Sequence, residues 1–330
     1  MSPRLPNSWI GRGVTARSLA HAFAALFVVS ILAVGLSFAR QQPIRVNTNL
    51  VQVNFTARDT QGALVTTLTK DDLELLEDST PQSIAFFARS TDVPLTLGLV
   101  LDISGSQSHF GKQHQHDLEV FLKNVLGPKD RAFLVCFADH IRLISDFSPS
   151  STALTQSLEG FEHDKHPKYP ELGPPEDRDG GTAFYDSIYD SVAEKLAGEN
   201  GRRALLIFSD GEDNSSAYDE VSAIQEAQRA DVPIFTIRYT ETHHGKLNAT
   251  NKYGIRVMDR IAADTGAAAF DSSQMKPEEY FKQIEEDLRS SYEVGYYTTN
   301  SAKDGTFRKV VIRAKQPGYT IRAKPGYYAR

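Results

Sequence analysis

The sequence predicts an α/β fold in which helices cover both faces of a doubly wound, mostly parallel sheet. From Pro94 onward, short apolar runs alternate with amphipathic stretches, which is the order of strands and helices in such a sheet. The run LTLGLVL at 95–101 is apolar without interruption, as expected of a strand buried on both faces. β-type segments before Pro94 and after Ser291 predict a small β module formed by the two flanks.

Length and composition set the scale of the molecule. A chain of 330 residues, 40% hydrophobic and 24% charged, suits one medium domain and a smaller one. The net charge of −6 gives no reason to expect nucleic acid as a partner. The single cysteine, Cys136, excludes an intrachain disulfide. We expect a targeting segment, a β segment, an α/β domain and a closing β segment, at residues 1–45, 46–93, 94–291 and 292–330.

The first 45 residues have the pattern of an export signal. Three arginines and no acid precede a nearly continuous apolar run at 19–38. Ser37 and Ala39 supply the small residues of a cleavage site, but the run is also long enough to span a bilayer. A cleaved signal and a single N-terminal membrane anchor both remain open. Either places the rest of the chain outside the cytoplasm, as a periplasmic, secreted or membrane-anchored protein.

The α/β part can be taken element by element. After 95–101, residues 116–126 carry the apolar stripe of an amphipathic helix. Two strands then follow closely enough to form an antiparallel pair at the sheet edge, 132–137 and 141–147. The Pro- and Gly-rich segment 163–181 predicts a long loop, a type that is often functional. The remaining helices are expected near 151–160, 183–197, 216–230, 254–265 and 277–291, and the remaining strands at 203–209, 232–237 and 267–271.

Oxygen-bearing side chains follow the buried strands. Asp102, Ser104 and Ser106 come directly after the first strand, Thr182 opens a helix after two glycines, and Asp210 follows the strand 203–209. The carboxyl ends of parallel strands share one edge of a sheet, where α/β proteins bind ligands. Two carboxylates and three hydroxyls, with no His or Cys, favour Mg²⁺ first and Mn²⁺ or Ca²⁺ next. Neutral hydroxyl ligands leave the ion electrophilic, so an acidic group of a partner can occupy an open position.

These segments resemble the von Willebrand factor type A (VWFA) family. DISGS at 102–106 matches the D-x-S-x-S motif of its metal-ion-dependent adhesion site, while GGTAFYD and FSDGEDN resemble the segments that carry its Thr and second Asp. With its flanking β segments, the chain resembles the VWFA-related proteins of acidobacteria. The resemblance implies a Rossmann-like fold that binds a protein partner through a divalent cation. It also implies that Ser104, Ser106 and Thr182 are direct or near-direct ligands, and that Asp102 and Asp210 bind directly or through water.

Other interpretations compete with this one. Taken singly, the five residues can be turn or helix-capping residues, and we expect the histidines, His114 among them, to lie on the surface. A phosphoryl-transfer enzyme could use Asp102 as a nucleophile beside Mg²⁺, although position 104 then lacks the second carboxylate. The metal could also merely stabilise a structural component of an envelope complex. We therefore expect a non-enzymatic, extracytoplasmic protein-binding module, in which the loop 163–181 shapes or covers the partner site.

Overall fold

The structure is a computed structural model that describes residues 50–91, 93–163, 169–240 and 246–329. The predicted targeting segment, 1–45, lies outside these residues. Within them, no helix combines the length and the apolar character needed to cross a bilayer.

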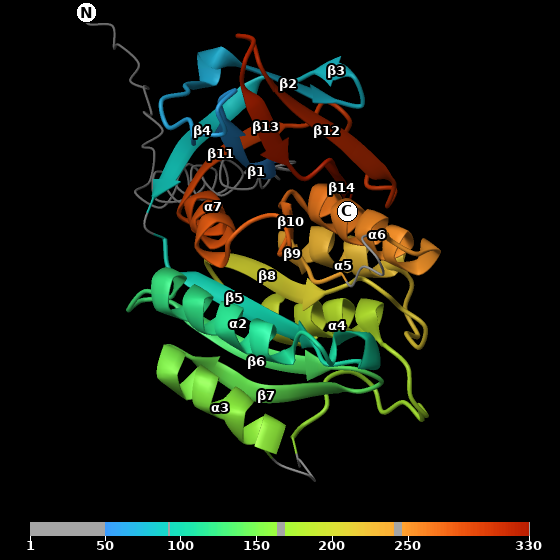
Figure 1. The fold of residues 1–330 in the computed structure, drawn as a ribbon. Helices are drawn as coiled ribbons and strands as arrows, with labels where there is room; N and C mark the ends of the chain where they lie inside the picture. Colours follow the sequence, from blue (N-terminus) through green and yellow to red (C-terminus); the bar gives the residue numbers. More distant parts are fainter. Residues whose placement is uncertain (1–49, 92, 164–168, 241–245, 330) are drawn as a thin grey trace, which may run out of the picture. The chain divides into compact units, whose positions relative to one another are not determined.

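A six-stranded sheet forms the centre of the α/β part (Figure 1). Its strand order is β10-β9-β8-β5-β6-β7. The first five strands are mutually parallel, and β7 pairs with β6 in the antiparallel direction at the edge, as predicted. All eight residues of β5 are buried, which confirms that its apolar run is covered on both faces. The bounds are β5 (Leu95–Asp102), β6 (Arg131–Phe137), β7 (Ile141–Ser148), β8 (Arg202–Ser209), β9 (Ile234–Arg238) and β10 (Ala269–Asp271).

Helices cover both faces of this sheet, each over its own hydrophobic core. One core is closed by α2 (Gly111–Val125), α3 (Ser151–His163) and α7 (Pro277–Arg289). The other is closed by α4 (Phe184–Asp190), its π-helical continuation η3 (Ser191–Leu196), α5 (Glu220–Ala230) and α6 (Ala249–Thr265). The predicted doubly wound α/β class is therefore confirmed.

Several helix starts differ from the expected ones because polar caps set them. α6 begins before 254, since Asn248 and Asn251 form a reciprocal capping box with hydrogen bonds of 2.7 and 3.3 Å. α5 begins after 216, since the side chain of Asp219 accepts a hydrogen bond from the N–H of Ser222 at 2.8 Å. Apolar periodicity does not reveal either cap.

The β-type flanks form two packed four-stranded sheets, ordered β13-β1-β11-β4 and β14-β12-β2-β3. Their apolar faces enclose a third core, and β1 pairs with β11 although the α/β part separates them in sequence (Figure 1). The β module built from both flanks is thus present, while the domain boundaries at 93/94 and 291/292 remain predictions. The strands are β1 (Leu50–Arg58), β2 (Leu73–Glu77), β3 (Thr80–Pro81), β4 (Ile84–Thr91), β11 (Ser290–Tyr297), β12 (Phe307–Ala314), β13 (Thr320–Ala323) and β14 (Gly326–Tyr328), with the short helices η1 (Lys70–Asp72) before β2 and η2 (Gly105–Gln107) after β5.

Asp287 at the end of α7 joins the two parts of the molecule. Its carboxylate is buried and accepts hydrogen bonds from Arg58 of β1 and Arg322 of β13, both at 2.7 Å. Arg58 also binds Glu286 at 3.0 Å. Removing one partner of such a buried network leaves charges without compensation, which is more destabilising than losing an exposed pair.

We predict that Asp287→Ala lowers the free energy of unfolding by about 3 to 5 kcal/mol. The matched control is Asp264→Ala, which removes the exposed pair with Arg260 and should change it by less than about 1 kcal/mol. Urea unfolding of the three proteins measures both values. Equal losses in the two variants would show that Asp287 does not join the β module to α7.

Candidate metal centre

The candidate site lies at the carboxyl end of β5, in the middle of the six-stranded sheet. β5 is flanked by β6 and β8. The helix that follows β5, α2, packs on one face of the sheet, whereas α4, which precedes β8, packs on the other (Figure 1). This change of side is the topological switch point at which α/β proteins form a ligand crevice.

Asp102 is the last residue of β5 and is fully buried. Its Oδ1 accepts a hydrogen bond from the N–H of Ser104 at 2.9 Å, and its Oδ2 accepts one from the hydroxyl of Ser209 at 2.5 Å. Ser209 ends the neighbouring strand β8, so strand pairing brings this donor to Asp102. Each carboxylate oxygen has two lone pairs and therefore still has one to offer a cation.

Asp210 directly follows β8 and is also buried. Its Oδ2 accepts a hydrogen bond from the side-chain amide of Gln107 at 2.7 Å, and its Oδ1 accepts one from the N–H of Glu212 at 3.0 Å. The same Gln107 amide donates to the carbonyl oxygen of Tyr239 at 3.2 Å. The segment after β5 thus holds the second carboxylate directly.

The two carboxylates carry a charge that the protein does not balance. Burial raises the pKa of Asp102 to about 7, and the charge of Asp210 adds to the rise, although hydrogen bonds from Ser104 and Ser209 oppose it. Burial and Asp210 likewise raise the pKa of Glu212. Among the described residues, no Lys, Arg or His forms an ion pair with Asp102 or Asp210. A bound cation would supply the missing charge, so the donor set fits a metal ion.

The hydroxyls of Ser104 and Ser106 lie 3.2 Å apart, next to Asp102 in sequence. Ser104 is buried, while Ser106 is exposed. Ser104 occupies the capping position of η2, but its side chain makes no capping hydrogen bond. The capping interpretation of this serine is therefore not realised, and its hydroxyl stays available at the site.

Thr182 lies in the segment before α4 and is buried. The loop after β8 holds its backbone, because its N–H donates to Asn214 Oδ1 at 2.7 Å and its carbonyl accepts from the N–H of Asn214 at 3.1 Å. The capping residue of α4 is Ala183, so Thr182 is not a helix cap. Among the described residues, its hydroxyl has no hydrogen-bond partner.

Four of the five predicted residues form one connected group. Hydrogen bonds link Ser106 to Ser104, Ser104 to Asp102, and the segment of Ser104 to Asp210 through Gln107. Thr182 is joined through the backbone of the loop that carries Asp210. Within the described part of the chain, no three His, Cys, Asp or Glu side chains are grouped to hold a metal; the predicted set has only two carboxylates.

Sequence reasoning missed the residues that position the site. Gln107 and Ser209 hold the carboxylates, and Asn214 holds Thr182. Ser209 and Asn214 lie inside the FSDGEDN segment, so strand pairing could have suggested them. No sequence pattern pointed to Gln107, because its partner Asp210 is 103 residues away.

A glycine on α6 allows that helix to approach Asp210 closely. A Cβ built on Gly254 would lie 2.2 Å from the carbonyl oxygen of Asp210, which is far inside van der Waals contact. Any larger residue must therefore displace the backbone that carries the second carboxylate. The site therefore requires a glycine at position 254, although this residue lies outside the three sequence motifs.

His114 is buried, and its expected surface position was wrong. Its ring packs 4.2 Å from that of Tyr239, and burial lowers its pKa to about 4. It faces the apolar side of α2 because α2 begins at Gly111, five residues before the predicted start. A neutral imidazole behind the carboxylates adds no positive charge to the site.

Fold and site together define an α/β domain of the doubly wound type with oxygen donors gathered at its switch point. The observed topology is the doubly wound, mostly parallel sheet that the sequence predicted. No family model and no curated protein matches the sequence.

Solved structures that resemble the chain include three of note. A von Willebrand factor type A protein from Catenulispora acidiphila shares 11% identity, with a TM-score of 0.43 over 87% of this chain and 74% of its own. An aerotolerance-related membrane protein from Bacteroides fragilis shares 13%, with 0.44 over 59% and 98%. Proximal thread matrix protein 1 from the mussel byssus, with a zinc-occupied adhesion-site motif, shares 16%, with 0.44 over 62% and 49%. These likenesses concern the fold.

The raised pKa of Asp102 predicts how the stability of the metal-free protein depends on pH. Its pKa rises from 3.8 to about 7 on folding, so the folded state binds the proton more tightly and stability falls as pH increases between these values. In chelator at pH 8, Asp102→Asn should therefore raise the free energy of unfolding by up to about 4 kcal/mol, and the gain should vanish near pH 4. Urea unfolding at both pH values measures it; a loss of stability at pH 8 would contradict the charge imbalance.

Proposed function

We propose that the protein binds a divalent cation at Asp102, Ser104, Ser106, Thr182 and Asp210, and captures a protein partner through that ion. One observation carries the proposal: two adjacent buried carboxylates have no basic partner among the described residues. Burying uncompensated charge is costly, and a metal ion is the compensation that oxygen donors without His or Cys can hold.

The five residues would bind the ion in two different ways. The hydroxyls of Ser104, Ser106 and Thr182 would be neutral ligands, and the two carboxylates would bind directly or through water. Mg²⁺ is the first choice because it keeps several waters and accepts few protein carboxylates. The bound ion would supply a Lewis-acidic position for an incoming ligand. Ser106 is exposed and marks the side from which that ligand enters.

An acidic side chain of a partner protein is the ligand that best suits such an ion. The protein would contribute neutral hydroxyls around it, so a carboxylate from outside completes the charge balance. We place the function in binding, and not in catalysis, because Asp102 is fully buried and both of its oxygens accept hydrogen bonds. A nucleophile for phosphoryl transfer needs an accessible oxygen.

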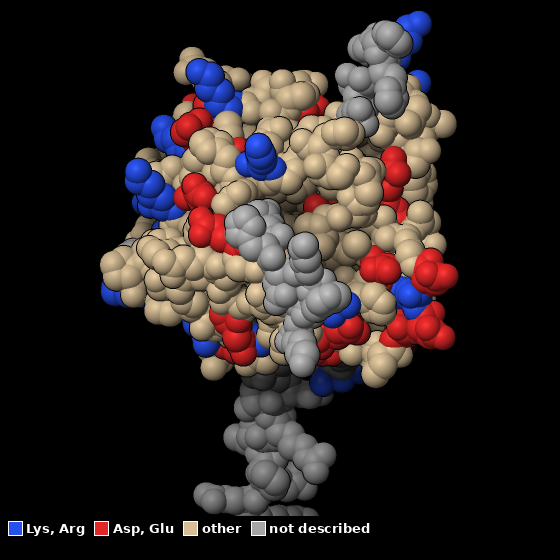
Figure 2. Space-filling view, turned by 60° about the horizontal axis from the view of Figure 1, so that its bottom comes forward, with Lys and Arg blue, Asp and Glu red and all other residues tan. Residues whose placement is uncertain are grey.

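Nucleic acid is not the proposed partner. On the face seen in Figure 2, Lys and Arg side chains are interspersed with Asp, Glu and uncharged residues and form no continuous basic surface. Together with the net charge of −6, this distribution offers no track for a phosphate backbone.

We further propose that the protein acts outside the cytoplasm, as a periplasmic, secreted or membrane-anchored module. The support is the basic and apolar pattern of residues 1–45 alone. Mass measurement of the protein from cell fractions distinguishes a cleaved signal from a retained anchor.

Metal binding can be tested directly with Asp102→Asn and a control variant. Burial, with the nearby charges of Asp186 and Glu194, also raises the pKa of Asp190 to about 7, so this residue is the matched control. Mg²⁺ should stabilise the parent protein and Asp190→Asn alike, and it should not stabilise Asp102→Asn. Calorimetry and thermal unfolding with Mg²⁺, Mn²⁺ and Ca²⁺ measure this. Equal stabilisation of both variants would place the ion elsewhere.

Substitutions of Thr182 distinguish an effect on partner binding from an effect on folding. We predict that Thr182→Ala weakens metal affinity at least about tenfold, while Thr182→Ser, which keeps the hydroxyl, stays close to the parent. Both variants should unfold at similar temperatures in chelator. In pull-downs from envelope extract, capture should require Mg²⁺, fail with chelator and fail with Thr182→Ala. Capture that is unchanged by chelator and by Thr182→Ala would leave the ion a purely stabilising role.

A further inference from the structure

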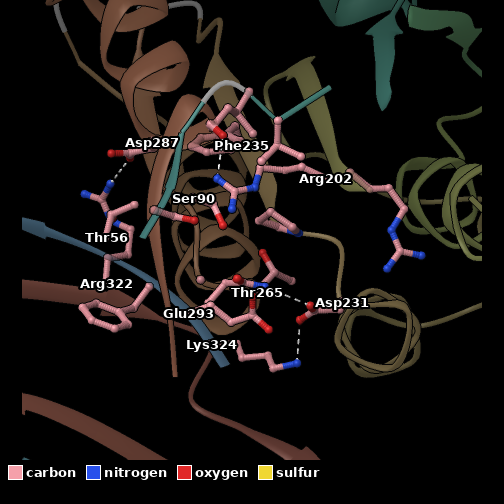
Figure 3. A pocket seen from close by; sticks show the side chains of 18 of the residues that line it. Thr56, Ser90, Arg202, Asp231, Phe235, Thr265, Asp287, Glu293, Arg322 and Lys324 are labelled. Atoms are coloured by element: carbon pink, nitrogen blue, oxygen red, sulfur yellow. Dashed lines mark hydrogen bonds and ion pairs between the residues drawn. The ribbon is translucent and has the colours of Figure 1, made fainter. Parts of the chain in front are cut away.

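A cavity of about 260 Å³ lies between the β module and the amino end of the six-stranded sheet (Figure 3). It is remote from the candidate metal centre, because Arg202 begins β8 while Asp210 follows its end. At about 3.3 Å per residue, the two positions are roughly 25 Å apart. Nothing in the proposed metal-dependent function uses this cavity.

The walls of the cavity combine polar and apolar surfaces. On β1 and β11, side chains alternate, so that Phe55 and Tyr292 enter the β core while Thr56, Ser291 and Glu293 are left for the opposite face. The α/β part contributes apolar surface, including Phe235 and Leu288. The cavity therefore has both charged and apolar walls, which is the character of a small-molecule site.

Most of the charges around the cavity neutralise one another. Asp287 binds Arg322 at 2.7 Å, and Asp231 binds Lys324 at 2.6 Å and the amide of Asn54 at 3.2 Å. Figure 3 marks the ion pairs of Asp287 with Arg322 and of Asp231 with Lys324 as dashed lines. They account for four of the seven charged side chains that line the cavity and leave Arg202, Arg203 and Glu293. Arg203 donates to the carbonyl oxygens of Leu196 and Ala197, both at 3.2 Å.

Arg202 is a cation without an anionic partner. Its guanidinium donates one hydrogen bond, to the carbonyl oxygen of Leu288 at 2.7 Å, and the structure gives it no ion pair with any described residue. Burial lowers its pKa, while the charges of Glu293 and Asp231 raise it. The remaining N–H groups of the fork can serve a carboxylate, whose two oxygens match them.

Two further groups are unsatisfied beside Arg202. The side chain of Glu293 forms neither a hydrogen bond nor an ion pair with any described residue, although it is near enough to influence Arg202. The hydroxyl of Ser291, two residues earlier on β11, is buried and has no hydrogen-bond partner in the described part of the chain. Buried polar groups are rarely left without a partner, so the Ser291 hydroxyl indicates a missing one. Glu293 is half-buried, and its carboxylate is open to a ligand or to water.

We propose that this cavity binds a small zwitterion of the size of a free α-amino acid. Its carboxylate would pair with Arg202, its ammonium group would pair with Glu293, and Ser291 would complete the hydrogen bonds. The volume is just below the usual range for drug-sized ligands, so it suits a molecule of this size. The apolar walls leave room for a short apolar side chain.

Such a ligand would contact strands of both the β module and the α/β sheet. A ligand that binds only the folded protein stabilises it by RT ln(1 + [L]/Kd). Binding should therefore raise the midpoint of thermal unfolding in a concentration-dependent manner. Because chelator is present throughout, the result does not depend on the proposed metal site.

The experiment titrates the full chain with glycine, L-alanine, L-leucine and L-glutamate by calorimetry and thermal unfolding. Propionate and ethylamine are the matched probes that lack one of the two charges. We expect saturable binding of at least one small amino acid and at least tenfold weaker binding of both probes. Arg202→Met should abolish binding of the amino acid, and Glu293→Gln should weaken it at least tenfold without weakening propionate.

Glu293→Gln and Ser291→Ala keep the test decisive if Arg202→Met does not fold, since neither removes an ion pair found in the structure. Weaker amino-acid binding in both variants, with unchanged unfolding midpoints in the absence of ligand, supports the proposal. It is overturned if no amino acid binds saturably up to about 10 mM, the weak end of typical small-molecule affinities. It is equally overturned if binding is unchanged in these variants.

Discussion

The buried and unbalanced pair Asp102 and Asp210 is the constraint on which the rest of this site depends. Both carboxylates lie at the switch point of the sheet because β5 and β8 are neighbours, and each is held by one backbone N–H and one side chain. This arrangement does not stabilise the metal-free protein, since burial and repulsion by Asp210 oppose ionisation of Asp102. A bound cation would attract both carboxylates and offset their repulsion. The donor chemistry and the charge of the site therefore both support metal binding.

Sequence alone predicted the features that depend on local pattern. The unbroken apolar run of β5 predicted a doubly covered strand, and the ends of two such strands predicted where Asp102 and Asp210 meet. It could not predict the contacts that hold them, because Gln107 reaches a partner more than a hundred residues away. It also misplaced His114, since a polar first turn hid the true start of α2.

The cavity beside Arg202 shows a second limit of sequence patterns. Arg58 and Arg202 look alike in a sequence, each beside a predicted strand. In the structure, Arg58 binds Asp287 and Glu286, whereas Arg202 has only a carbonyl oxygen. The difference arises where the polar face of β1 and β11 meets the amino end of the sheet, a surface made by segments far apart in the chain. The proposal of a small ligand there rests on the paired and unpaired charges taken together.

The segments GGTAFYD and FSDGEDN are separate in sequence but are joined by hydrogen bonds in the structure. The loop that begins with Asp210 also holds Thr182 through Asn214. A Cβ on Gly181 would lie 2.6 Å from Asn214 Oδ1, and its φ of +108° is one that L side chains rarely adopt. The glycine before Thr182 is therefore required by the loop of the second carboxylate. The loop after β8 carries Asp210 and also holds the backbone of Thr182, so a displacement of this loop moves donors from both segments.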